Sequence, residues 1–359
     1  MLPKIISTKD KPIKKIGLYA DPHLSQSSSI IVGRQGEFTG RLDNLIQSFK
    51  WMRNLFKEQN VDMIICLGDL TDRPDLTATE ITALSKCNID NDYLIIGNHC
   101  RSDKDGNINS LSIYNNILSS PQSLIEDEEG NCLVYVLPYN STYVDLSTLN
   151  HPKVILSHND IKGYLLNGFI FKSGYEMTDI IDNCDLFING HLHNGQWLVK
   201  DKICNLGMLS GSNFASCNGE WNPSAGILDL DTLHLEIYEN PCAYKFRKIE
   251  FDSLPKIKNY LDSLNGEHYV IQIKVPNRLA ENTRKLLNGC KKIDASRVLT
   301  TVENINTKET VDKGNLNVSS ISVYSKLREF IGNQKKSSKF NLEIVNKIID
   351  DLETNEGVE

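Results

Sequence analysis

Short apolar runs alternate along the chain with stretches whose apolar residues recur at helical spacing. Between the first two runs, residues 41–59 place a row of apolar side chains on one helical face. This alternation predicts an α/β fold in which that helix packs on a sheet. The runs themselves have the length and the Ile, Leu and Val content of buried strands, and they are residues 14–20, 61–68, 92–97, 152–157 and 184–190.

A second unit is expected after a boundary in residues 250–265. A strand pattern at 268–275, a helical pattern at 278–290 and a strand pattern at 297–305 follow one another there. We therefore predict a small α/β cap at residues 265–318, after a main domain at residues 1–254. A C-terminal helical segment, residues 319–359, carries an apolar stripe made of Leu342, Val345, Ile348, Ile349 and Leu352.

Asp, Asn or His side chains follow each of the five strand patterns. Ligands of open α/β sheets bind beyond the carboxyl ends of the strands, so these side chains are expected to form one site. Imidazoles and carboxylates suit divalent metal ions, and two adjacent ions need a bridging carboxylate, for which Asp69 is the natural candidate. One such motif alone is weak, but five in order at strand ends, two of them preceded by Gly68 and Gly97, favour a metal site. The residues are Asp21, His23, Asp69, Asn98, His99, His158, His191 and His193.

The ordered pattern D-x-H, G-D, G-N-H, H and G-H-x-H resembles the calcineurin-like metallophosphoesterase superfamily over about residues 14–195. The resemblance implies two packed mixed β-sheets flanked by helices, with residues 1–254 as a two-metal phosphoesterase domain. It implies that His99 is catalytic without being a ligand. It also implies two ligand sets that share one carboxylate: Asp21, His23, Asp69 and His193 for one ion, and Asp69, Asn98, His158 and His191 for the other.

Within that superfamily the chain looks most similar to SbcD-type nucleases, including their phage forms. The phrases GNH, SHNDIKG and GHLHNGQ carry this resemblance, together with the basic C-terminal module. It implies an exonuclease or endonuclease that acts on DNA in recombination or double-strand-break repair. The implied partners are an SbcC-type coiled-coil ATPase, held by the C-terminal segment, and a second copy of the chain in a homodimer.

Two positions depart from the SbcD-type pattern. Asp72 stands where a substrate-contacting His is expected, and Cys100 follows GNH in place of an acidic residue. Asp103, Asp105 or a backbone carbonyl would then have to orient His99.

The sequence around these positions also leaves other functions open. The segment GDLTDR also resembles the GDxxDR of protein phosphatases, so a phosphatase or a small-molecule phosphodiesterase is the alternative function. A metal-free binding subunit is disfavoured because all seven ligand positions are filled.

The net charge of -7 is uneven along the 359 residues. Residues 1–254 carry -10 and residues 255–347 carry +8. A basic rear module fits an anionic substrate, although a solvated Lys-rich surface explains the charge equally well. Because the ligand set offers oxygen and nitrogen without thiolate, two manganese ions are favoured.

The cysteines and the hydropathy of the sequence indicate the cellular compartment in which the protein is expected. Nine cysteines without a CxxC pair suggest reduced thiols, and there is neither a signal-peptide pattern nor a membrane-spanning apolar run. A soluble cytoplasmic protein without membrane contact is expected. The other three histidines, His151, His234 and His268, fit no ligand spacing and are expected on the surface or in the core.

Overall fold

The computed structural model describes residues 5–9, 12–28, 34–35, 37–103, 108–139, 143–166, 169–214 and 219–301. Its contacts divide the chain into Met1–Glu303 and Asn304–Glu359. The predicted C-terminal segment 319–359 and the end of the predicted cap lie outside the described residues. In the described part, no helix combines the length and apolarity that a membrane crossing needs.

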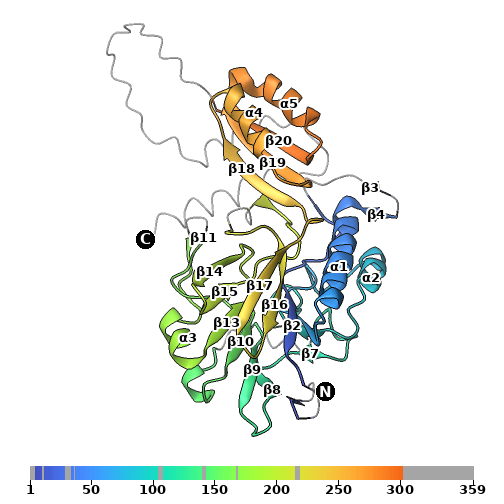
Figure 1. Cartoon of the computed structure of the whole chain (residues 1–359). Coiled ribbons are helices and arrows are strands. Elements are labelled where there is room, and N and C mark those ends of the chain that lie inside the picture. The colour runs from blue at the N-terminus through green and yellow to red at the C-terminus, as the bar shows by residue number, and fades with distance from the viewer. Residues whose placement is uncertain are drawn as a thin grey trace, which may run out of the picture. The chain divides into compact units, whose positions relative to one another are not determined.

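One of the two large sheets has six strands, of which the central ones are parallel. Helices α1 (Gly40–Glu58) and α2 (Ala78–Ser85) cover its outer face (Figure 1). The helix predicted at residues 41–59 is α1, and the Thr39 side chain caps its first turn by accepting from the backbone N–H of Leu42. The strand order is β17 (His234–Glu239), β16 (Ser224–Asp229), β2 (Lys15–Tyr19), β5 (Met63–Cys66), β6 (Tyr93–Ile95) and β7 (Ile117–Leu118).

The second large sheet has seven strands and is also mixed. Helix α3 (Met177–Asn183) and the 3-10 turn Leu146–Thr148 pack on its outer face. Two short hairpins complete this part of the chain, β3 (Arg34–Gln35) with β4 (Phe38–Thr39) and β11 (Leu165–Leu166) with β12 (Phe169–Ile170). The strand order is β1 (Ile6–Ser7), β8 (Gln122–Glu126), β9 (Cys132–Leu137), β10 (Val154–Ser157), β13 (Leu186–Asn189), β15 (Ile203–Asn205) and β14 (Gln196–Val199).

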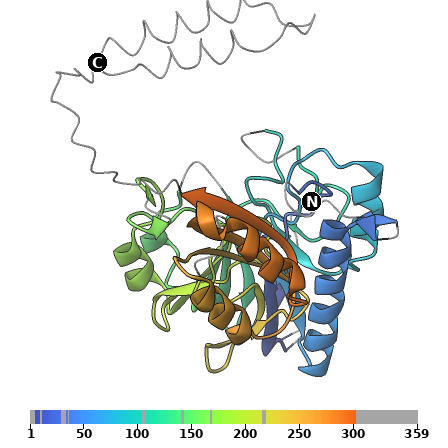
Figure 2. The same ribbon diagram turned by 90° about the horizontal axis from the view of Figure 1, so that it is seen from above.

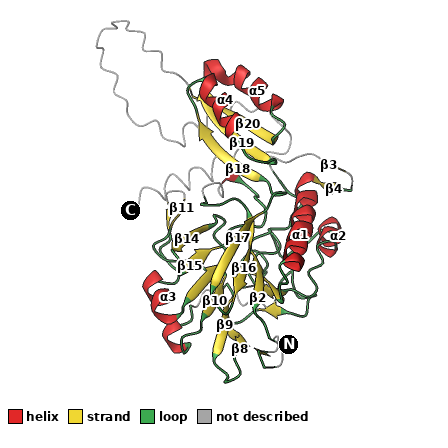
Figure 3. Cartoon of the chain, in the orientation of Figure 1, coloured by secondary structure: helices red, strands yellow, loops and turns green. Residues whose placement is uncertain are grey.

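The two sheets face each other across one apolar layer. Leu18 of β2 and Leu156 of β10 belong to it, whereas Tyr19 and Cys66 turn to the opposite face and pack under α1. Both faces of the central strands are therefore buried, which explains why their sequences are continuously apolar. The predicted fold of two packed mixed sheets flanked by helices is confirmed, as Figure 3 shows.

The cap is a three-stranded parallel sheet, ordered β18 (Lys245–Glu250), β19 (Tyr269–Pro276) and β20 (Ile293–Thr301). Parallel neighbours need a crossover, and helices α4 (Leu254–Ser263) and α5 (Ala280–Gly289) supply the two crossovers, with the 3-10 turn Asn277–Leu279 leading into α5. Figure 2 shows the two helices side by side.

The strand, helix, strand order predicted for residues 268–305 is present as far as Thr301. The sheet begins earlier than the predicted boundary, however, because β18 pairs with β19. Within residues 250–265, where a linking segment was expected, Leu254–Ser263 form α4. The ring of Phe246 in β18 contacts the domain before the cap, with its centroid 5.1 Å from that of Phe214. Just before β18, the carbonyl oxygen of Cys242 accepts a 2.6 Å hydrogen bond from Asn44 of α1.

Candidate metal centre

The polar residues that follow the five predicted strands meet at one place in the structure. Two groups of potential metal-binding atoms contain most of these side chains, Asp21 with His23 and His193, and Asp69 with His158 and His191. The backbone N–H of Asp21 donates to Gly68 O at 3.1 Å, which joins the ends of β2 and β5. Each group draws on both large sheets, because Asp21, His23 and Asp69 follow strands of the six-stranded sheet and the other three residues follow strands of the seven-stranded one.

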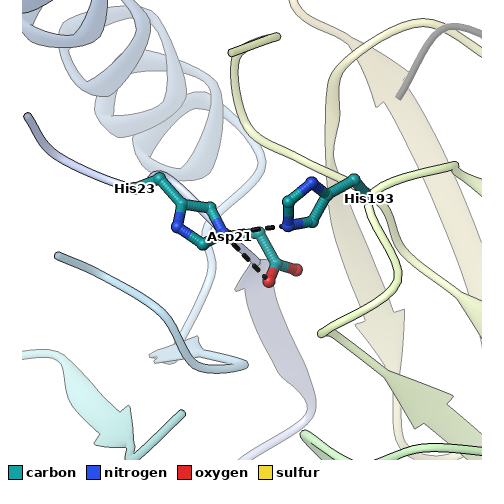
Figure 4. Close-up of side chains that lie close together, drawn as sticks. All are labelled: Asp21, His23 and His193. Atoms are coloured by element: carbon teal, nitrogen blue, oxygen red, sulfur yellow. Dashed lines mark hydrogen bonds and ion pairs between the residues drawn. The ribbon is translucent and has the colours of Figure 1, made fainter. Parts of the chain in front are cut away.

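The first group is Asp21, His23 and His193, whose side chains point toward one another (Figure 4). The two Nε2 atoms of the histidines lie 2.9 Å apart, and His23 Nε2 is 3.8 Å from Asp21 Oδ1. Burial raises the pKa of Asp21, and its Oδ2 atom is buried without a hydrogen-bond partner among the described residues. Burial, together with the charge of His23, lowers the pKa of His193 well below its usual value, which keeps that imidazole neutral. A divalent cation fits this group because it would supply the partner that the buried carboxylate oxygen lacks.

The second group is Asp69, His158 and His191, and Asn98 lies against it. The side-chain oxygen of Asn98 is 3.0 Å from His191 Nδ1 and 3.3 Å from His158 Nε2. His158 is fully buried and its Nδ1 lies 2.6 Å from the carbonyl oxygen of Leu67, so Nε2 is the nitrogen that faces the group. Oxygen and imidazole donors again suit a divalent metal ion.

Asp69 lies between the two groups. Its Oδ2 atom is 3.2 Å from His158 Nε2 and 3.8 Å from His23 Nε2, and its Oδ1 accepts from the backbone N–H of His99 at 2.8 Å. Burial alone would raise the pKa of Asp69, but the charge and hydrogen bond of His158 and the charge of His23 bring it below its usual range. In turn, the charge and hydrogen bond of Asp69 outweigh the effect of burial and raise the pKa of His158 to about 9. This position is the one that a bridging carboxylate would need.

The backbone at the site is strained. Four of the predicted ligands have left-handed φ angles: 49° at Asp21, 45° at His23, 47° at Asp69 and 67° at His191. Such conformations are unfavourable for residues other than glycine and persist where the surrounding structure enforces them, often at functional sites.

Two glycines make room for the ligands. Gly68 has a φ of 107°, and a Cβ there would lie 2.0 Å from His158 Nδ1. A Cβ at Gly97 would lie 2.1 Å from Asp69 Oδ1. The tight turn expected from the sequence is therefore present at Gly68, whereas Gly97 is required for close approach.

His99 lies outside these two groups, but with His23 and Asp72 it forms a third set of potential ligand atoms. Its side chain is 41% exposed, and its Nδ1 lies 2.9 Å from the backbone carbonyl oxygen of Asp72. Of the alternatives for orienting His99, the structure has the backbone carbonyl: the Asp103 carboxylate accepts instead from the N–H of Ile108, and Asp105 lies outside the described residues. With Nδ1 held by this carbonyl, Nε2 is the ring nitrogen that remains for other contacts.

Asp72 also contacts the first group. Its Oδ1 atom is 3.2 Å from Nδ1 of His23, and the nearby imidazole of His23 lowers the pKa of Asp72. The carboxylate therefore lies against the outer nitrogen of His23, and Nε2 faces Asp21 and His193.

Comparison with known proteins agrees with this geometry. The sequence profile of the calcineurin-like phosphoesterases matches residues 14–195, half of the chain, and includes all of the residues above. The chain belongs to the calcineurin-like phosphoesterase family. Membership implies a metal-dependent hydrolase of phosphoesters.

Curated protein sequences and solved structures were also compared with the chain. No curated protein sequence matches the chain. Among solved structures, the chain is similar to Yfce, a phosphoesterase from E. coli, with 12% identity over 63% of this chain and 99% of that one. The TM-score of 0.29 is too low to support the fold assignment further.

One buried cation of this phosphoesterase was not anticipated from the sequence. The guanidinium of Arg41, in the first turn of α1, donates to the carbonyl oxygens of Pro22 at 3.0 Å and Gly211 at 2.7 Å and to the hydroxyl of Ser210 at 3.1 Å. Burial lowers its pKa to about 10, so it remains charged at neutral pH. Arg41 therefore fixes the turn between two ligands, but a single Arg at a helix start has no sequence signature that would reveal this role.

The histidines that were expected outside the phosphoesterase site do lie elsewhere. His151 pairs with Asp185 at 3.3 Å, and His268 pairs with Asp294 at 2.8 Å. His234 is exposed on β17. Two residues near the site were missed: Asp160, which contacts His191, and Tyr139, whose ring centroid is 5.5 Å from that of His191.

Proposed function

We propose that this phosphoesterase is a metal-dependent DNA nuclease that acts in recombination or double-strand-break processing. The observation that best supports this proposal is the basic character of the cap: residues 245–301 carry 12 Lys and Arg against 6 Asp and Glu. Binding to the phosphates of DNA depends on such a surplus of cationic side chains. The cap belongs to the same compact unit as the metal centre, whose surroundings are acidic.

His99 supplies the acid that phosphodiester cleavage requires. Two divalent ions, for which we propose manganese, would activate a water molecule for attack on phosphorus. In the imidazolium form of His99, Nδ1 keeps its proton and donates it in a hydrogen bond to the Asp72 carbonyl oxygen, while the Nε2 proton can pass to the leaving oxygen. Because the side chain is 41% exposed, a large substrate can reach it.

The alternative is a phosphatase or small-molecule phosphodiesterase, and the GDLTDR segment is its main support, since Asp72 lies in the site. A phosphate monoester carries more charge than a diester and calls for additional cations beside the metals. The arginine of that segment, Arg73, is already engaged: it forms an ion pair with Glu80 and donates to the carbonyl oxygen of Asp75 at 2.7 Å. Glu80 is itself fixed in the capping box of α2 with Thr77. This arrangement favours the diesterase.

The proposed partner is an SbcC-type coiled-coil ATPase, bound through the C-terminal segment 319–359. Its apolar stripe, Leu342 to Leu352, lies outside the described residues, and such a stripe suits the groove of a helical partner. Truncation after Asn333 should abolish co-purification with the ATPase and preserve basal cleavage of DNA. Full partner affinity in the truncated protein would exclude this role. A homodimer is a further part of the proposal, and sedimentation of the purified chain tests it.

The substrate class is tested with purified protein and Mn²⁺ on four substrates: linear duplex DNA, hairpin DNA, p-nitrophenyl phosphate and bis-p-nitrophenyl phosphate. Cleavage of either DNA that disappears in Asp69→Asn supports the nuclease. Hydrolysis of p-nitrophenyl phosphate without DNA cleavage would select the phosphatase. Asp185→Asn, which changes an exposed carboxylate that pairs with His151 outside both the cap and the ligand sets, serves as the control for nonspecific effects.

A further inference from the structure

Asp160 belongs to neither predicted ligand set, yet its side chain contacts one of the predicted ligands. Its Oδ1 atom lies 2.9 Å from Nε2 of His191, and the two side chains are only 18% and 17% exposed. The other ring nitrogen of His191, Nδ1, lies 3.0 Å from the side-chain oxygen of Asn98, on the side of the second metal-binding group. The two nitrogens of this ring thus have different surroundings.

These contacts determine which nitrogen of His191 carries the proton. A carboxylate can only accept a hydrogen bond, so Nε2 must be the N–H that donates to Asp160. In the neutral ring Nδ1 then presents its lone pair to the group formed by Asp69 and His158. A metal-binding histidine commonly has its outer N–H fixed by a carboxylate or a carbonyl in this way.

Two other histidines at the centre have the nitrogens exchanged. His23 has Nδ1 against the Asp72 carboxylate, and His158 has Nδ1 against the Leu67 carbonyl oxygen, so each turns Nε2 inward. Because His191 turns Nδ1 inward instead, its acceptor must lie on the opposite edge of the ring. Asp160 occupies that place.

The backbone holds Asp160 firmly. Its carbonyl oxygen accepts from the N–H of Tyr175 at 3.0 Å, and Ile161 forms a β-bridge with Tyr175. Gly174 lies so close that a Cβ there would be 2.4 Å from the Asp160 carbonyl oxygen and 2.9 Å from its Cβ. The residue is therefore a fixed part of the site and differs in this respect from a mobile surface acid.

We propose that Asp160 is a positioning residue for the second metal ion, acting through the tautomer and the ring orientation of His191. It is absent from the groups of atoms close enough to share one ion, so its effect is indirect. Removing such an outer-shell carboxylate typically weakens metal binding by about 10- to 100-fold. The first group makes no contact through Asp160, and its affinity should not change.

The test compares Asp160→Ala and Asp160→Asn with the unaltered protein and with Asp294→Asn. Asp294 is a matched control because it makes the same kind of contact, 2.8 Å to a histidine nitrogen, in the cap. Mn²⁺ binding is measured by titration calorimetry and, at fixed free Mn²⁺, by equilibrium dialysis with elemental analysis. In Asp160→Ala, one binding event should weaken by about 10- to 100-fold while the other stays within threefold. The Mn²⁺ affinity of Asp160→Asn, which keeps an acceptor oxygen, should lie between those of Asp160→Ala and the unaltered protein. The Mn²⁺ affinities of Asp294→Asn should equal those of the unaltered protein.

Two results would overturn the proposal. One is an unchanged pair of Mn²⁺ affinities in Asp160→Ala. The other is equal weakening of both binding events together with a lower melting temperature of the metal-free protein, which would make Asp160 a general structural residue. Neither readout uses DNA or any other substrate, so the result is independent of the proposed nuclease function.

Discussion

Gly97→Ala is a minimal change that should disturb the site through a single methyl group. The new Cβ would lie 2.1 Å from Asp69 Oδ1 and 2.5 Å from the Asp69 backbone nitrogen, whereas Cβ atoms essentially never approach other atoms within 3.0 Å. Either the loop after β6 or the Asp69 carboxylate must therefore move by about 1 Å, and overpacking of this kind costs about 1–3 kcal/mol of folding stability. Because Asp69 lies between both groups, a displacement of that size should reduce kcat/KM by about 100-fold.

The assay measures hydrolysis of bis-p-nitrophenyl phosphate and DNA at saturating Mn²⁺, together with thermal unfolding. Gly289→Ala is the matched control, since a Cβ at this last residue of α5 meets nothing within 4 Å. It should leave activity unchanged and slightly raise helix stability. Wild-type kcat/KM in Gly97→Ala would refute the argument that this glycine is required for the position of Asp69.

Three further predictions concern individual side chains. Asp69→Ala should abolish hydrolysis and remove most bound metal, and retention of two ions by elemental analysis would contradict its bridging position. His99→Gln should reduce kcat by about 10²- to 10⁴-fold while metal content stays unchanged, because a general acid acts without coordinating the ions; loss of metal would show that His99 is a ligand. In the metal-free protein His158 holds its proton up to about pH 9, so metal binding at neutral pH must displace that proton and should strengthen as pH rises toward 9. Calorimetry in buffers of different ionisation enthalpy measures the proton release, and its absence would contradict the raised pKa.

Much of the site could be predicted because it depends on local sequence. Each ligand directly follows a buried strand, and the strand pattern alone places Asp21, Asp69 and His158 at carboxyl ends. The group that orients His99 could not be predicted from the sequence, because it is the backbone carbonyl of a residue 27 positions away. A backbone carbonyl has no sequence signature, and only the three-dimensional path of the chain brings it within reach.

The boundary of the cap was harder to predict from the sequence for a related reason. Strand β18 reads as a continuation of the strand-rich domain before it, and its membership in the cap depends on parallel pairing with β19 across α4. The apolar residues Ile257 and Leu261 already had helical spacing, so α4 itself could have been recognised. Asp160 was overlooked because an acid two residues after His158 is common on surfaces, and its contact with His191 spans 31 positions of sequence.

The division of ligands between the two large sheets has a mechanical consequence. The apolar layer between them is non-directional, so it opposes separation of the sheets more strongly than small sliding movements. Coordination bonds are directional, and each predicted ion would take ligands from both sheets, so the pair of ions would act as a cross-link at one end of the sandwich. Because ions that bind only the folded state stabilise it, chelation should lower the melting temperature. It should also accelerate amide hydrogen exchange at the carboxyl ends of β2, β5, β10 and β13 before it does so at their opposite ends.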